Sequence, residues 1–174
     1  MTARLWRPFP IRRLHVEERV HIEADHTERA AIAEALDLIG VDTLTAELTV
    51  KPWRQHGVRV IGAVDGRVTQ ACSLTLEPVE AHVDEHIDLR LHPDAGTSDG
   101  EVDVEEADPP ERLESDTVDL GAIVLEHFAL GLDPYPRAPG AVFEGGEDES
   151  EDDDAAAHPF AALAALKNST PEGA

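Results

Sequence analysis

The strongest constraint on the fold is a succession of strand-like runs in the middle of the chain. In residues 44–50, and again in residues 79–91, apolar residues alternate with polar or charged ones, as in strands that have one buried and one solvated face. Residues 58–64 and 68–76 are rich in β-branched residues, and Asp65-Gly66 between them favours a two-residue type I′ turn. The pattern predicts a twisted antiparallel sheet of about five to six strands.

Two helices are expected beside this sheet, after a first short strand within residues 15–23. Asp25, with Glu28 three residues later, forms a capping-box pattern that begins the first helix. Gly40 is a suitable residue to end that helix, and its apolar face is formed by Ile32, Ala35, Leu36 and Ile39. A second helix is predicted over about Val118–Leu130. The expected fold class is therefore α+β, with two main helices and a short C-terminal helix.

Length and charge limit the classes of protein that fit. The 174 residues carry a formal net charge of −23, and one folded domain is expected at this length. Residues 1–67 hold ten basic and ten acidic side chains, whereas residues 68–174 hold four basic and 27 acidic ones. Such a surface repels polyanions and argues against extensive wrapping of nucleic acid.

Cysteine content and hydropathy exclude further classes. The lone Cys72 rules out an intrachain disulfide and fits a buried structural thiol better than a nucleophile. No apolar run approaches 18 residues, so no membrane-spanning helix is expected. The N-terminal arginines are followed by no apolar segment of the secretory type.

Composition divides the chain into four parts. Residues 1–14 are predicted to be a basic, irregular or edge-like arm, since they contain Pro8 and Pro10. Residues 15–143 are predicted to form the α+β domain, with an acidic mobile loop expected over residues 93–115. An acidic disordered linker is expected over residues 144–157, and a short amphipathic helix and tail over residues 158–174.

The N-terminal arm carries the main basic cluster. It consists of Arg4, Arg7, Arg12 and Arg13, interspersed with Trp6 and Phe9. This cluster either contacts RNA or an acidic patch of a partner, or pairs with the acidic half of its own chain.

A metal site is the main alternative reading of the central strands. His82, Asp84 and His86 share one strand face, and imidazole and carboxylate groups are zinc ligands. Neighbouring positions on that face lie about 6.6–7 Å apart, so three successive ligands would splay. We therefore favour a solvated polar face over a metal-dependent hydrolase.

The C-terminal segment has the features of a tethered docking helix. Pro159 suits the first helical position, and Lys167 suits the last turn. Phe160, Leu163 and Leu166 would be its apolar anchors. A helix this short is marginal alone, so it is expected to dock either on its own domain or on a partner.

Three stretches of the chain follow one another in a recognisable order. The first comprises Gly62-Ala63-Val64 and Gln70–Pro78, the second runs from Asp119-Leu120-Gly121 to Pro134-Tyr135-Pro136-Arg137, and the third is Pro159–Lys167. In this order and spacing, over about residues 15–167, they resemble the YceD family, named as large ribosomal RNA subunit accumulation proteins. The run Pro-Tyr-Pro-Arg-x-Pro-Gly resembles the alphaproteobacterial members.

The resemblance implies a cytoplasmic, non-enzymatic factor in large ribosomal subunit biogenesis. It also makes Tyr135 and Arg137 candidate partner-binding residues. Many family members carry Cys-x-x-Cys where this chain has Cys72-Ser73-Leu74-Thr75, so a metal-binding role does not carry over.

The acidic half of the chain favours one kind of partner. We expect the protein to bind a basic large-subunit ribosomal protein or an assembly factor, with large-subunit rRNA as an additional contact through the N-terminal arginines. No cofactor, membrane or small-molecule substrate is expected.

Overall fold

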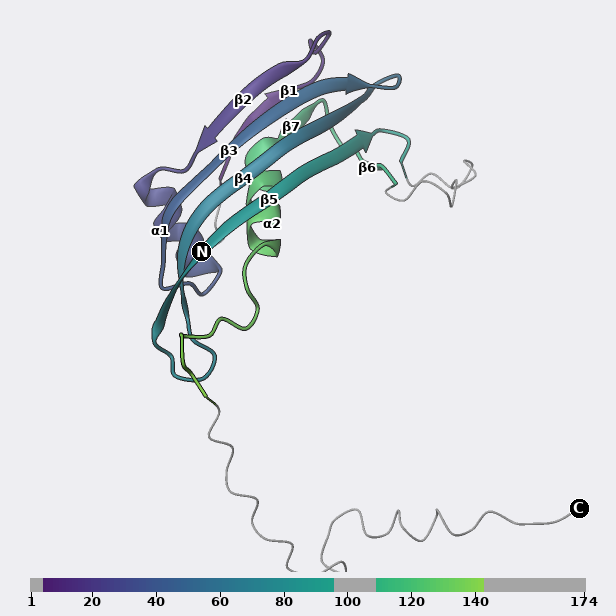
Figure 1. Cartoon of the computed structure of the whole chain (residues 1–174). Coiled ribbons are helices and arrows are strands. Elements are labelled where there is room, and N and C mark those ends of the chain that lie inside the picture. The colour runs from purple at the N-terminus through teal and green to yellow at the C-terminus, as the bar shows by residue number, and fades with distance from the viewer. Residues whose placement is uncertain (1–4, 96–108, 143–174) are drawn as a thin grey trace, which may run out of the picture. The chain divides into compact units, whose positions relative to one another are not determined.

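A curved sheet of five strands forms the framework of the protein (Figure 1). The computed structural model describes residues 5–95 and 109–142, and the elements discussed below belong to one compact unit that ends at Ala141. The sheet order is β2-β3-β4-β5-β6. The strands are β2 (Glu18–Glu23), β3 (Gly40–Trp53), β4 (Gly57–Ala71), β5 (Pro78–His92) and β6 (Glu111–Arg112).

The sheet is mixed rather than purely antiparallel, which corrects the sequence prediction. Strands β2 to β5 form an antiparallel meander, but β6 pairs with Leu91 and His92 of β5 in the parallel sense. The connection between β5 and β6 is long enough for a crossover, which a parallel neighbour requires.

The Asp65-Gly66 turn prediction is wrong, because β4 continues straight through this dipeptide. Asp65 pairs with Thr45 on one side and with Asp84 on the other, and Gly66 pairs with Leu44 and Val83. The chain reverses instead around Arg54 and His56, both at positive φ, and again in the loop that follows Ala71. Long ladders on both sides outweigh the local turn propensity of Asp-Gly.

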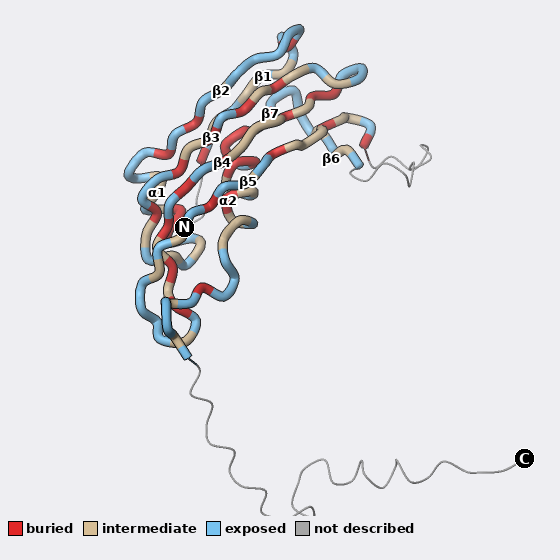
Figure 2. The backbone as a smooth tube through the Cα atoms, viewed as in Figure 1, coloured by how far each residue is buried: buried red, intermediate tan, exposed pale blue. Residues whose placement is uncertain are grey.

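The predicted alternation of β3 and β5 is confirmed. In β3, Leu44, Leu48 and Val50 are buried while Glu47 is exposed. In β5, Val83, Ile87 and Leu91 are buried while the even positions from Glu80 to His86 are exposed. Figure 2 shows this alternation of buried and exposed positions along the sheet. We call the buried side the inner face and the opposite side the open face.

Helix α1 (His26–Ala35) begins as predicted and ends earlier than predicted. Its capping box is present: the Glu28 amide donates to Asp25 Oδ1 at 2.8 Å, and the Asp25 amide donates to Glu28 Oε2 at 2.9 Å. The helix ends because Asp37 adopts a φ of 54° and the Leu38 amide donates to the Ala33 carbonyl, a Schellman-type ending. Gly40 therefore begins β3 instead of ending α1, and Ile39 is exposed.

Helix α2 (Leu120–Leu130) confirms the second predicted helix and lies across the inner face against β4 and β5 (Figure 1). Val118 precedes it in strand β7 (Thr117–Asp119). Phe128 of α2 is fully buried. None of the helices in the described ranges is long and apolar enough to cross a membrane.

The N-terminal segment is more ordered than an irregular arm. Strand β1 (Pro8–Pro10) pairs antiparallel with β7, and Leu5 is buried. A Cβ at Gly121 would lie 1.7 Å from the Leu5 carbonyl oxygen, so only glycine permits this close approach of the segment to α2.

Candidate partner-binding surface

The loop between β4 and β5 presents an apolar side chain to solvent. The Cys72 amide donates to the Glu77 carbonyl at 2.8 Å, and the Leu76 amide donates to the Cys72 carbonyl at 3.0 Å. Leu76 sits at a φ of 61°, a strained conformation for a leucine, and its side chain is 76% exposed. The loop therefore holds Leu76 outward instead of burying it.

The segment after α2 is fixed against this loop. Gln70 Nε2 donates to the Asp133 carbonyl at 2.9 Å, and the Ser73 amide donates to the Pro136 carbonyl at 2.8 Å. Pro134 and Pro136 prevent this arm from continuing the helix, because proline fixes φ and has no amide to donate to a helix. Loop and arm thus form one unit although more than 50 residues separate them.

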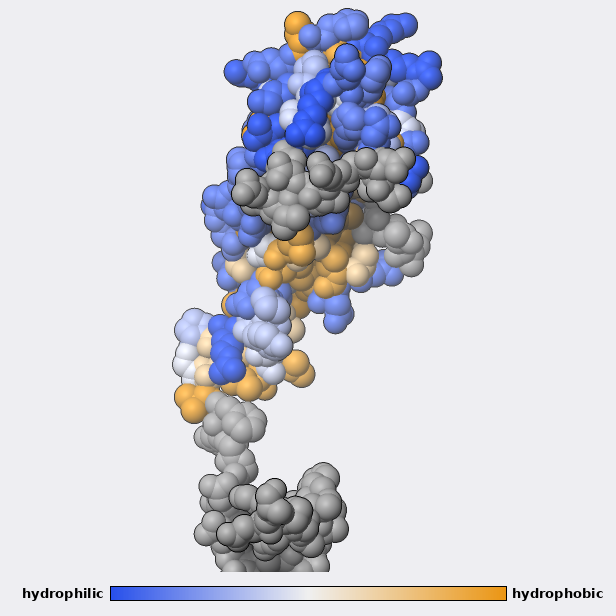
Figure 3. All heavy atoms as spheres, turned by 90° about the vertical axis from the view of Figure 1, so that its right-hand side faces the viewer, coloured by the Kyte–Doolittle hydropathy of each residue, from blue (hydrophilic) through white to orange (hydrophobic). Residues whose placement is uncertain are grey.

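The arm exposes Tyr135 and Arg137 on either side of the buried Pro136. Tyr135 is 72% exposed, and its amide donates to Asp133 Oδ1 at 2.8 Å. We call residues 72–77 and 133–138 together the tip surface. In Figure 3, hydrophobic and hydrophilic residues are mixed at the end of the domain that adjoins the grey trace.

Cys72 joins the two halves of the tip surface from below. Its side chain is fully buried, as expected for a structural thiol, and Sγ accepts from the amides of Ala138 at 3.3 Å and Thr75 at 3.5 Å. The Thr75 hydroxyl, followed by these amides and that of Leu74, lowers the pKa of the thiol to about 6. The hydrogen bonds from Ala138 and Thr75 to the sulfur thus hold the arm on the loop.

Two of the N-terminal arginines pair with acidic groups of their own chain. Arg7 makes a two-pronged contact with Glu28, at 2.7 and 2.9 Å, which raises the pKa of Arg7 and lowers that of Glu28. Arg12 pairs with Asp116. Arg13 is exposed and makes no ion pair within the described ranges, and Arg4 lies outside them.

The proposed metal ligands point outward from the open face. His82 Nε2 lies 2.5 Å from Asp65 Oδ2 on the neighbouring strand, so its partner is not one of the other two candidates. No set of three His, Cys, Asp or Glu residues in the described part of the chain is arranged to hold a metal ion. The hydrolase alternative has no support from this geometry.

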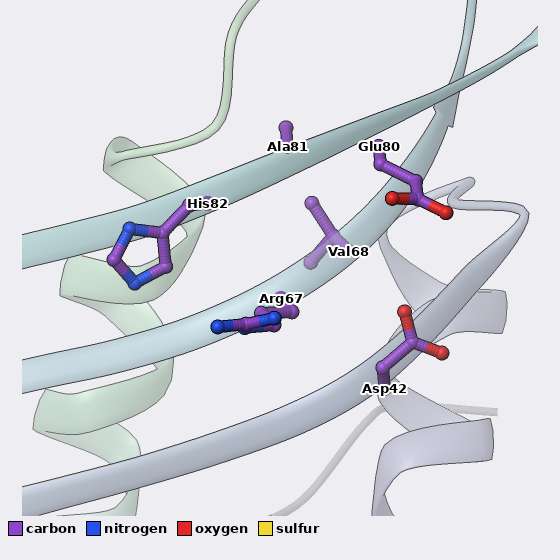
Figure 4. Close-up of a pocket in the computed structure, with 6 residues that line it drawn as sticks. All are labelled: Asp42, Arg67, Val68, Glu80, Ala81 and His82. Atoms are coloured by element: carbon purple, nitrogen blue, oxygen red, sulfur yellow. The ribbon is translucent and has the colours of Figure 1, made fainter.

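A hollow of about 540 Å³ lies between β3, β4 and β5, with His82 in its lining (Figure 4). Asp42 comes from β3, Arg67 from β4, and Glu80 and His82 from β5. Only Val68 and Ala81 contribute apolar side chains to the lining. Small-molecule sites are mostly apolar with a few polar groups, so this lining does not resemble one.

The sequence alone did not bring the tip surface together. Gln70, Ser73 and Leu76 were not among the candidate residues, although they lie in the first stretch that carried the family resemblance and Tyr135 lies in the second. Phe160, Leu163, Leu166 and Lys167 lie outside the described residues.

Comparison with known proteins assigns the family. The model of large ribosomal RNA subunit accumulation protein YceD matches residues 60–167, which is more than half of the chain. The chain belongs to the YceD family. The YceD match spans the tip surface as well as β5 and α2. No curated protein and no solved structure gave a match.

Proposed function

We propose that this YceD-family protein acts in large ribosomal subunit biogenesis by binding, without catalysis, a basic ribosomal protein or assembly factor in the cytoplasm. The family is named for accumulation of the large-subunit RNA and not for an enzymatic reaction, which supports the first part of the proposal. The identity of the partner class rests on the charge of the protein and on its tip surface.

The tip surface is the observation that carries the proposal. Tyrosine and arginine are enriched among the residues that dominate binding energies, and Tyr135 and Arg137 stand exposed on a backbone already fixed by hydrogen bonds. A fixed arm loses little conformational entropy on binding. Leu76 adds exposed apolar area on the adjoining loop.

The surrounding charge selects a basic partner. In residues 68–95 and 109–141, twelve carboxylates stand against three arginines. A field of one sign accelerates encounter with the opposite charge and discourages partners of the same charge.

An rRNA contact remains part of the proposal as a second, smaller contribution. Because Arg7 and Arg12 are engaged with Glu28 and Asp116, Arg13 and Arg4 are the N-terminal residues proposed for phosphate contact. We also propose that the segment with Phe160, Leu163, Leu166 and Lys167 acts as a tethered docking element.

The test is a double variant of the arm, Tyr135→Ala with Arg137→Ala, compared with Val16→Ala. Val16 is 69% exposed and lies outside the tip surface, so it is a matched surface change. We expect the double variant to lose co-sedimentation with large-subunit particles while its melting temperature stays within a few degrees of the unmodified protein. Normal co-sedimentation of a folded double variant would contradict the role of the tip surface.

A further inference from the structure

The edge of β5 is long and unpaired over most of its length. Strand β6 pairs only with Leu91 and His92, and among the described residues no other segment pairs with residues 78–90 along that edge (Figure 1). The ladder between β4 and β5 has no register shift, so the edge is regular. In an antiparallel edge strand, every second residue directs its backbone amide and carbonyl away from the strand it pairs with. About six amides and six carbonyls of residues 78–90 are therefore available to hydrogen-bond an added strand.

The charge along this edge is acidic and only partly compensated. Asp88 is neutralised by Arg59, whose Nε and Nη2 lie 2.6 and 2.5 Å from its two oxygens. Glu80, Asp84 and Glu85 make no ion pair within the described ranges. Acidic charge is thus concentrated in the unpaired part of the strand.

The two faces beside the edge differ in polarity. On the open face, Glu80 and Asp84 are exposed, four residues apart. On the inner face, Val79, Ala81 and Leu89 are half-buried apolar side chains at the margin of the core, and the half-buried Glu85 lies between Ala81 and Leu89. A strand added here would meet carboxylates with one set of alternate side chains, and with the other it would meet apolar groups interrupted by Glu85.

We propose that the β5 edge binds an extended basic segment of a partner protein as an added strand. Lysine or arginine at alternate positions would face Glu80 and Asp84, and the intervening residues would be apolar against the inner face. This inference rests on the proposed function, since it specifies how the basic partner is held. A second copy of this chain is disfavoured, because two such edges would place like charges opposite one another.

The test uses a blocked nine-residue peptide of alternating lysine and valine as the probe for the full-length protein. Affinity is measured by calorimetry, and protection of the amides of residues 78–90 is measured by hydrogen exchange. We expect slowed exchange in this strand. The same peptide with every amide N-methylated keeps its charge but cannot donate to the strand, so its affinity should fall at least tenfold. A peptide of the same composition with all lysines in one block should also bind at least tenfold more weakly.

Paired variants locate the acidic contribution. Glu80→Gln with Asp84→Asn should weaken binding of the alternating peptide about fivefold or more. Glu34→Gln with Glu126→Gln removes the same charge from exposed helix positions and should change the affinity less than twofold. Light scattering of the full-length protein should show no dimer formed through the β5 edge.

Equal binding of the alternating, N-methylated and block peptides would overturn the inference, because charge alone would then explain it. Self-association that is abolished by Val83→Pro in a folded variant would overturn it in favour of a second copy. The proposed function is tested separately by the arm variant, Tyr135→Ala with Arg137→Ala, which should lose its association with large-subunit particles. Particle association without protection of β5 by the peptide would reject only the added strand, whereas protection without particle association would reject the biogenesis role.

Discussion

Gly66 of β4 lies directly beneath the ring of Phe128 in α2. A Cβ at position 66 would lie 2.6 Å from Phe128 Cε2 and 3.0 Å from the Thr43 carbonyl oxygen. The missing side chain therefore sets how closely α2 approaches the sheet, and the adjoining arm continues from the end of that helix. The same glycine that suggested a turn in the sequence is a packing residue in the fold.

Replacing Gly66 with alanine should destabilise the protein by about 1–3 kcal/mol, because the added methyl group overpacks the contact with Phe128. Gly40→Ala is the matched control, since nothing lies within 4 Å of a Cβ there. Urea unfolding of both variants measures the difference. Equal stability of the two would show that α2 does not pack on β4 as described.

Glu28→Gln should cost about 1 kcal/mol at neutral pH, since it removes the charge that pairs with Arg7 while glutamine can still complete the capping box. The pair lowers the pKa of Glu28, so its stabilisation is present above the ordinary pKa of about 4.5 and is lost as pH falls through the lower folded value. The difference in urea midpoint between the unmodified protein and the Glu28→Gln variant should therefore decrease in acid. A gap that stays constant with pH would contradict an ionic origin.

Cys72→Ser should remove a pH dependence of stability. The folded pKa of about 6 lies below the ordinary thiol value of about 9, so the thiolate contributes fully above pH 9 and loses its contribution as pH falls through 6. We expect the stability of the unmodified protein relative to the serine variant to increase from pH 5 to pH 9. Thiolate absorbance in the folded protein provides an independent titration, and a midpoint near 9 would contradict the hydrogen-bonded thiolate.

Phe160→Ala with Leu163→Ala should abolish association with ribosomal particles and leave the melting temperature of the folded domain nearly unchanged. The reason is that a tethered docking helix contributes its apolar face to a partner and not to the domain core. Gradient sedimentation and calorimetry measure the two effects. Melting of the whole domain at a lower temperature would place the segment in the core instead.

The sequence by itself determined the features that depend on neighbours along the chain. The alternation in β3 and β5, the capping box of Asp25 and Glu28, and the existence of α2 follow from periodicity and from hydrogen bonds within a few residues. The ordered stretches that carried the YceD resemblance also lie in the sequence alone.

Only the tertiary structure decided which of these segments contact one another. Asp65-Gly66 became strand because β3, β5 and Phe128 surround it, and Asp37 rather than Gly40 ended α1. Arg7 forms an ion pair with Glu28, and the Ser73 amide donates to the Pro136 carbonyl, across long stretches of sequence. Local propensities amount to about 1 kcal/mol or less per residue, so burial and ladder pairing between distant segments outweigh them wherever the two disagree.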